Sequence, residues 1–208
     1  AAGAVSLSGA GLAHVTGNAG GMAGTTALDG GGGLVIGNNN AIGSGTINVT
    51  AATNLFTAGY GAAAGSSTFT LANPITLNAD LVVRGDQNLT LNGLVSGLGA
   101  ANRTVTLNTN NASSVVVGPG GISLSNDGTA RTFTVTNNTF NHQAATVSGP
   151  IVNGAGAANH AFQKAGIGWL TLSNNANSYA GSTTVAAGVL QVTANNALGA
   201  SGSLTTNQ

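Results

Sequence analysis

Short strands and tight turns are the strongest constraint that this sequence places on its fold, and residues 164–202 show them most clearly. Apolar residues alternate there in pairs, Leu170 with Leu172 and Leu190 with Val192, and glycine, asparagine and serine stand between the pairs. Runs of period two with such boundaries indicate strands joined by turns. The intervals between the runs are too short for helices, so we predict an all-β chain.

Composition favours the same class. Only 4% of the 208 residues are charged, whereas about 25% is usual for a soluble domain. Glutamate is absent and Lys164 is the single lysine, so the solvent-facing sides of helices could not be built from their usual residues. The hydrophobic 42% consists mostly of Ala, Val and Leu, with 4% aromatic residues, which suits a narrow core of stacked small side chains.

Further strands are expected along the rest of the chain. The runs with the clearest alternation are Val5–Ser8, Gly33–Ile36, Thr46–Val49, Thr68–Leu71, Ile75–Leu77, Leu81–Val83, Leu89–Leu91, Thr104–Leu107, Ser114–Val117, Ile122–Leu124 and Thr132–Thr136. Asn-Gly and Asp-Gly pairs, which form tight turns, lie between several of them. Because such pairs also close antiparallel hairpins, turn chemistry alone leaves an antiparallel β-sandwich open beside a parallel β-solenoid.

The two ends of the sequence resemble each other. Gly32–Gly43 (GGLVIGNNNAIG) aligns without gaps to Gly188–Gly199 (GVLQVTANNALG), at an offset of 156 residues (188 minus 32). Self-similarity at a fixed period is typical of repeat architectures, although Gly- and Asn-rich text also matches itself by chance. We predict one solenoid domain over residues 1–208, with repeat-like ends at about 1–50 and 164–208 and a less regular middle.

The C-terminal part contains five short motifs in a fixed order, which are Gly166–Leu172, Asn177–Gly181, Thr183–Val185, Gly188–Val192 and Asn195–Gly199. In this order they resemble a known family, the passenger-associated transport repeat of autotransporters with a pertactin-like β-helix. Each piece alone is weak, but five pieces in the family's order make a specific match. The motif positions are Gly166, Gly168, Trp169, Leu170, Leu172, Asn177, Tyr179, Gly181, Thr183, Val185, Gly188, Leu190, Val192, Asn195, Leu198 and Gly199.

The resemblance implies a right-handed parallel β-helix in a protein that is secreted to a bacterial cell surface or extracellular matrix. Rungs of about 20–25 residues would then number about eight to ten, each rising ~4.8 Å. Neither end of the sequence carries a charged or amphipathic cap, so we expect the end rungs to be covered by more chain or by another copy. A net charge of zero removes the repulsion that would keep copies apart.

The acidic residues offer little for catalysis. Asp80 and Asp86, with Arg84 between them, form the one local cluster among four aspartates. Polysaccharide-cleaving β-helices need paired acids, so this cluster is the candidate site of such an enzyme; a solvated turn with an ion pair is the simpler interpretation. The tripeptide that ends at Asp86, Arg-Gly-Asp, also matches an integrin-recognition sequence, which is weak evidence in a Gly-rich chain.

Metal, thiol, phosphate and nucleic-acid sites are not expected. His14, His142 and His160 are scattered and have no carboxylate near them in sequence, which a metal centre would usually show. Without cysteine the chain has neither disulfides nor thiolate chemistry, and Gly30–Gly33 lacks the lysine of a phosphate-binding loop. Four basic residues are too few for a nucleic-acid surface. No apolar run is long enough for a membrane helix.

Two surface hypotheses rest on aromatic and threonine side chains. An exposed pair formed by Trp169 and Tyr179 would bind sugar rings, although packing in the core is their more ordinary role. Threonines that alternate along a strand would form an ice-binding face if they stacked in register, although Thr is common on outer strand faces. Such threonines are Thr68/Thr70, Thr104/Thr106 and Thr132/Thr134/Thr136.

We therefore expect a non-catalytic structural β-solenoid of a bacterial surface or extracellular fibre, without cofactor, metal, nucleic-acid partner or membrane insertion. It would self-associate into a filament by end-to-end rung stacking, or serve as the stalk of an adhesin. Its partner would be another copy or the continuation of a longer solenoid, with host or biofilm surfaces as further candidates. A polysaccharide-binding or polysaccharide-cleaving β-helix is the alternative, and an ice-binding solenoid is a lesser one.

Overall fold

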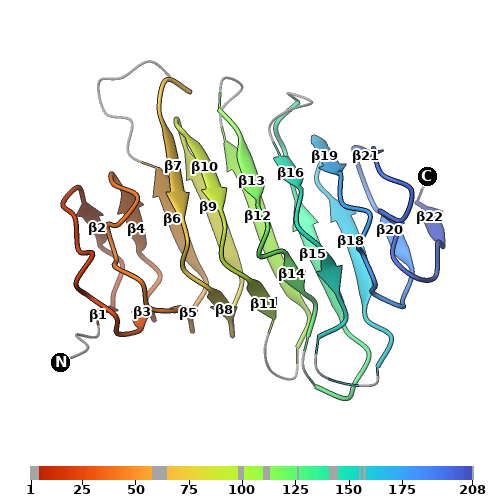
Figure 1. The fold of residues 1–208 in the computed structure, drawn as a ribbon, viewed down its shortest axis with the longest axis horizontal. Coiled ribbons are helices and arrows are strands. Elements are labelled where there is room, and N and C mark those ends of the chain that lie inside the picture. Colours follow the sequence, from red (N-terminus) through yellow and green to blue (C-terminus); the bar gives the residue numbers. More distant parts are fainter. Residues whose placement is uncertain are drawn as a thin grey trace.

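A computed structural model describes residues 5–57, 65–97, 101–109, 113–125, 127–140, 145–154, 156 and 158–207. Within these ranges the chain forms strands β1 to β22 and no helix. The strands follow one another along the long axis of the molecule, from the N-terminal to the C-terminal end (Figure 1). The predicted all-β class is confirmed.

The strands assemble into three sheets. Sheet A contains, in spatial order, β1 (Val5–Leu7), β3 (Thr26–Leu28), β5 (Ile47–Val49), β8 (Ile75–Leu77), β11 (Val95–Gly97), β14 (Ile122–Ser123) and β17 (Ile151–Val152). Sheet B contains β2 (Leu12–Val15), β4 (Gly33–Ile36), β6 (Thr53–Thr57), β9 (Leu81–Gly85), β12 (Arg103–Thr109), β15 (Thr132–Thr136), β18 (Ala161–Ala165), β20 (Thr183–Val185) and β22 (Leu204–Thr206). Sheet C contains β7 (Thr68–Leu71), β10 (Asn88–Leu91), β13 (Val115–Val117), β16 (Ala145–Val147), β19 (Trp169–Leu172) and β21 (Val189–Val192).

Every strand pairing among the described residues is parallel. The chain passes through sheets A, B and C and then returns one level higher, so one pass is one rung of a solenoid. Rung 1 contains β1 and β2, rung 3 contains β5 to β7, and rung 8 contains β20 and β21. About eight rungs are stacked in this way. The predicted parallel β-helix is confirmed, and the antiparallel sandwich is not formed.

Rung length varies more than the sequence predicts. Stacked residues are 20 positions apart at Trp169 and Val189 but 30 apart at Val115 and Ala145. The additional residues lie between the strands, at the corners of the solenoid. The expected 20–25 residues for each rung is too narrow a range, because corner segments at the surface tolerate insertions that strands in a ladder do not.

Columns of aliphatic side chains fill the interior. In sheet A, Ile47, Ile75, Val95, Ile122 and Ile151 lie directly above one another, and each is at most 2% exposed. Burying one such side chain contributes about 1.5–3 kcal/mol, so a column stabilises the stacking of all the rungs that it crosses. The stacked core expected from composition is present, with Ile, Leu and Val rather than Ala as its main members.

The strands predicted from alternation are all present, within a residue or two of their expected bounds. Alternation does not indicate eight other strands, which are β2, β3, β6, β11, β16, β17, β18 and β22. Most of these have two to four residues. Several of them carry a small or polar residue at an inward position, such as Thr26, Ala145 or Lys164, so the alternation of large apolar side chains is not visible in the sequence.

The rungs near the two ends differ from the middle. In rungs 1 and 2 residues 16–25 and 37–46 contain no strand and run where sheet C lies in the later rungs. Near the C-terminus, residues 173–182 and 193–203 take the place of strands of sheet A. Each pair of segments stacks through its backbone. For example, the N–H of Ser44 donates to the carbonyl of Met22 at 2.8 Å.

The internal repeat is a strand–turn–strand module whose two copies occupy different sides of the solenoid. β4 leads through a turn to β5, and β21 leads through the same turn to β22. Gly43 N–H donates to the Asn40 carbonyl and Gly199 N–H to the Asn196 carbonyl, each at 3.2 Å, and the two glycines have φ of 68° and 73°. β4 belongs to sheet B and β21 to sheet C, so the second copy is rotated by one side of the solenoid.

Candidate functional site

The repeat segment extends over β18 to β21 and the turn that follows. Leu170 and Leu172 point into the core from β19 and are fully buried. Leu190 and Val192 lie directly above them in β21, where Leu190 is partly buried and Val192 is 40% exposed. No described strand covers β21, which is the last strand of sheet C. The alternating pairs therefore line the interior, and the upper pair opens onto the C-terminal end face, formed by β21 and β22.

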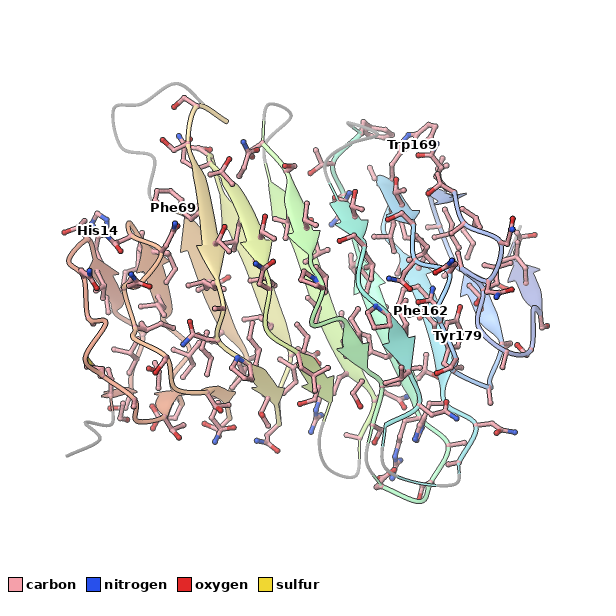
Figure 2. All side chains as sticks on the ribbon, viewed as in Figure 1. His14, Phe69, Phe162, Trp169 and Tyr179 are labelled. Carbon is pink, nitrogen blue, oxygen red and sulfur yellow. The ribbon has the colours of Figure 1, made fainter. Side chains whose placement is uncertain are left out.

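Tyr179 is a core residue. It is fully buried, and its ring centre lies 6.0 Å from that of Phe162, as Figure 2 shows within the C-terminal rungs. Its hydroxyl is 2.5 Å from the Thr183 hydroxyl, and burial raises the pKa of Tyr179. Trp169 is half-buried in β19. The two side chains thus do not form the exposed aromatic pair that sugar binding would need.

Asn177 joins three successive rungs. Its Oδ1 accepts the N–H of Ile151 from the rung below at 2.8 Å, and its Nδ2 donates to the carbonyl of Ala197 in the rung above at 2.7 Å. The side chain is only 6% exposed. A buried amide that satisfies one donor and one acceptor of the backbone holds the corner where residues 173–182 replace a strand.

The motif glycines lie where the backbones of adjacent rungs approach closely. At Gly199, φ is 73° and an added Cβ would lie 2.5 Å from the carbonyl oxygen of Tyr179. The other glycines with such contacts are Gly166, Gly168, Gly181 and Gly188. The remaining motif positions lie further outward: Val185 and Leu198 are half-buried, and Asn195 is exposed.

Lys164 is a buried charged side chain whose position the sequence analysis did not predict. It is fully buried in β18, and its Nζ donates to the carbonyls of Ala165, Gly166 and Ala187, at 2.6, 2.6 and 3.1 Å. Burial lowers its pKa to about 8. Its burial could have been predicted from the sequence, because Lys164 stands two positions after Phe162 in a strand and its side chain therefore points to the same, inward face. Through these three hydrogen bonds the amine connects the backbones of two successive rungs at the corner between sheets B and C.

The predicted acid cluster does not converge. Asp80 precedes β9 and Asp86 follows it, so the two carboxylates lie about 20 Å apart along an extended strand. Asp80 Oδ1 instead accepts the N–H of Thr104 at 2.8 Å. Arg84, between the two acids, is exposed on β9. Paired acids for glycoside hydrolysis stand about 5–9.5 Å apart, which this arrangement does not provide.

An ion pair forms elsewhere, between Asp127 and Arg131. Nη2 and Nε of Arg131 lie 3.0 and 3.1 Å from Asp127 Oδ2, and this contact lowers the pKa of Asp127. The backbone N–H of Arg131 donates to Nδ1 of His160 at 3.0 Å. His160 is fully buried, and its Nε2 finds no partner in the structure. Burial lowers the pKa of His160, so the neutral form of its ring is favoured.

Of the three histidines considered as metal ligands, the two that the structure describes do not come together. His14 lies in β2 of rung 1, His160 precedes β18 of rung 7, and His142 lies outside the described residues. In the part of the chain that the structure describes, no three His, Cys, Asp or Glu side chains come together to hold a metal.

The threonine pairs stack in register over only two rungs. Thr104 of β12 pairs with Thr134 of β15, and Thr106 pairs with Thr136. The next rung places Gln163 over Thr134, and the remaining pair belongs to β7 of sheet C. A flat threonine face over many rungs is therefore not present on sheet B.

Comparison with known proteins identifies the C-terminal segment. Residues 162–192 match the passenger-associated transport repeat, so the predicted resemblance to an autotransporter passenger repeat is confirmed there. A match to this family implies a secreted or cell-surface protein. No curated protein and no solved structure matches the chain. None of the described residues forms a helix that is long and apolar enough to span a membrane.

Proposed function

We propose that this chain is a non-catalytic structural segment of a bacterial surface or extracellular passenger, which lengthens a rod by rung stacking. The observation that carries the proposal is the continuous interior, whose aliphatic columns run from rung to rung and open at both end faces. Leu7 of β1, in register with the buried Leu28, is half-buried at the N-terminal end face, and Leu204 of β22, in register with the buried Thr183, is 48% exposed at the C-terminal end face.

The end faces are chemically suited to receive another rung. β1 and β2 are the first strands of sheets A and B, while β21 and β22 are the last strands of sheets C and B. One edge of each strand therefore has no strand partner among the described residues. None of the four strands contains Asp, Glu, Lys or Arg. A further rung, supplied by more chain or by another copy, would pair with these edges and cover the open core.

Electron microscopy of the purified chain at several concentrations tests this role. Unbranched filaments one solenoid wide would favour a fibre subunit, whose end faces template each other. Discrete short rods at every concentration would favour a stalk whose contacts lie along its sides. Compact, non-elongated particles would overturn the proposal of a rod.

The competing class is a polysaccharide-cleaving β-helix. We expect no release of reducing ends from polysaccharides by the wild-type chain. Turnover that disappears in Asp80→Ala or Asp86→Ala would contradict the non-catalytic assignment and would identify the acid that performs the reaction.

A further inference from the structure

A polar hollow lies beside the edge strand of sheet C, at the level of rungs 1 to 3. Rungs 1 and 2 have no strand on this side, so among the described residues the segments 16–25 and 37–46 lie below β7 in place of a strand. The hollow is a shallow depression, open to solvent, with a volume of about 570 Å³. Four asparagines line it together with Thr68 and Phe69 of β7, and three of them, Asn18, Asn38 and Asn39, have side-chain oxygens that accept backbone N–H groups.

The backbone fixes the orientation of all three amides. Asn18 Oδ1 accepts the N–H of Gly20 at 2.8 Å, Asn38 Oδ1 accepts that of Asn40 at 2.8 Å, and Asn39 Oδ1 accepts that of Thr70 at 2.9 Å. Because each oxygen faces a backbone donor, each NH₂ group is turned away from it. None of the three Nδ2 atoms has a hydrogen bond within the described structure. These three side chains line the hollow, and each carries an NH₂ group with two N–H donors whose orientation is set before a ligand arrives.

Phe69 adds an apolar surface to these donors. It occupies the inward column of sheet C and is in register with Leu89 in the rung above, but β7 is the edge strand, so its ring is only partly buried. Figure 2 shows Phe69 on the side of β7 nearest the first two rungs. An aromatic ring beside fixed amide donors offers both contacts that a sugar ring makes, through its C–H faces and through its oxygens.

None of the described residues that line the hollow is charged. An anion would find no cation there, and a cation would find no carboxylate. An extended peptide would have to pair with the edge of β7, where Asn39 already occupies the N–H of Thr70. From this combination we propose that the hollow binds a short stretch of a neutral saccharide, a function beyond that of a structural rod.

The second copy of the repeat provides a matched control. In the alignment of the two ends, Asn195 takes the place of Asn39 and Asn196 that of Asn40. No described strand covers the turn that contains Asn195, and no aromatic residue equivalent to Phe69 stands over it. The second copy has the same asparagines without an edge strand above them, so we assign saccharide binding to the N-terminal copy alone.

Titration calorimetry on the full chain tests the proposal with neutral maltohexaose, cellohexaose and mannohexaose, and with hexagalacturonate as the acidic probe. We expect saturable binding of at least one neutral probe. Asn39→Asp keeps the oxygen that accepts the Thr70 N–H but removes the NH₂ donors, so it should weaken binding at least tenfold. Phe69→Ala should do the same, and Asn195→Asp should leave the affinity unchanged.

Several outcomes would overturn the proposal. These are no binding of any neutral probe, tighter binding of hexagalacturonate than of all three neutral probes, or equal losses in Asn39→Asp and Asn195→Asp. Because Phe69 also contacts the core, circular dichroism would be measured on its variant; if Phe69→Ala unfolds, Asn39→Asp alone decides. The filament experiment is independent of this site, so either result can fail without the other.

Discussion

Lys164 places a positive charge in the interior, and its ionisation should be visible in stability. Burial lowers its pKa to about 8, from an ordinary value of 10.5 in the unfolded chain. Between these values the unfolded state binds more protons than the folded state, so the free energy of unfolding rises with pH above about 8. Below pH 8 the amine is charged in both states and the penalty of its burial is fully present.

We expect this rise in wild-type protein between pH 8 and about 9.5, with a slope of at most about 1.4 kcal/mol per pH unit. Lys164→Met keeps an unbranched side chain of similar length without an ionisable group, so its stability should be flat over this interval. Urea unfolding at half-unit steps of pH measures both. An identical rise in the variant would show that another group titrates.

His160 should change the stability of the protein in the acidic range, whereas Lys164 acts in the alkaline range. Burial lowers its pKa below the ordinary 6.5, so the unfolded state takes up a proton first as the pH falls. Stability should decline from about pH 6.5 downward. Of the charged groups near it, Asp127 favours and Arg131 opposes its protonation.

We expect His160→Phe to abolish the decline between pH 7 and 5, although it is less stable overall because the Arg131 N–H loses its acceptor. The ion pair at Asp127 titrates below 3.8 and does not interfere. Thermal unfolding of both proteins across this interval is the measurement. A decline of equal size in the variant would assign the acid sensitivity to other groups.

At the scale of the element, corner segments depend on side chains that replace the missing ladder. Asn177 supplies one acceptor and one donor to the rungs on either side. Asn73, 2% exposed, plays a similar part above the first repeat turn, where its Nδ2 donates to the carbonyls of Gly43 and Gly45 at 3.1 and 2.7 Å. Buried asparagines thus fix the corners at which a strand begins or ends in the solenoid.

Asn177→Leu should therefore cost about 2–4 kcal/mol, since a buried N–H and a buried carbonyl both lose their partner. Asn175→Leu, two positions earlier and exposed, is the matched control and should change stability by less than about 0.5 kcal/mol. Comparing the urea midpoints of the two variants with that of the wild type tests whether the Asn177 contacts between rungs stabilise the fold. Similar losses in the two variants would mean that local turn preference, not the contact between rungs, makes asparagine necessary.

The elements also show how far sequence alone reaches. Alternation located strands such as Thr132–Thr136, where Phe133 and Val135 face inward, but it passed over Thr26–Leu28 and Ala145–Val147, where a threonine or an alanine takes one inward position. Those short strands are held by register with their neighbours rather than by a pattern of their own. The motif around Leu170 and the turns could be predicted because the chemistry is local. The hollow at Phe69 could not, since it results from the point at which sheet C begins.

At the scale of the whole molecule, the positions of the two repeat copies show how further copies would be arranged along a longer solenoid. The module moves from β4, in sheet B of rung 2, to β21, in sheet C of rung 8. The offset of 156 residues thus corresponds to six rungs and one further side. An array with the same period would turn each copy by one side of the solenoid relative to the last. The offset was visible in the sequence, but the rotation was not, because corner insertions determine it.

The proposed association between copies would cover two leucines that lie in the interior columns at the open end faces. Leu7 of β1 continues the column of the buried Leu28 at one end, and Leu204 of β22 continues that of the buried Thr183 at the other, so a head-to-tail contact would cover both. Leu7→Asp combined with Leu204→Asp would bring two like charges into a contact that otherwise has none. We expect the concentration at which copies associate to rise at least tenfold, since each buried unpaired carboxylate costs several kcal/mol.

Sedimentation velocity across a concentration series measures this shift, and Phe140→Asp provides the control. Phe140 is 67% exposed, more than either leucine, but it follows β15 in rung 6 and lies on neither end face. Its substitution removes a comparable apolar surface without touching the ends, so association should persist. If Phe140→Asp disperses the copies and the double leucine variant does not, the molecules associate through their sides and the stalk arrangement is favoured over the filament.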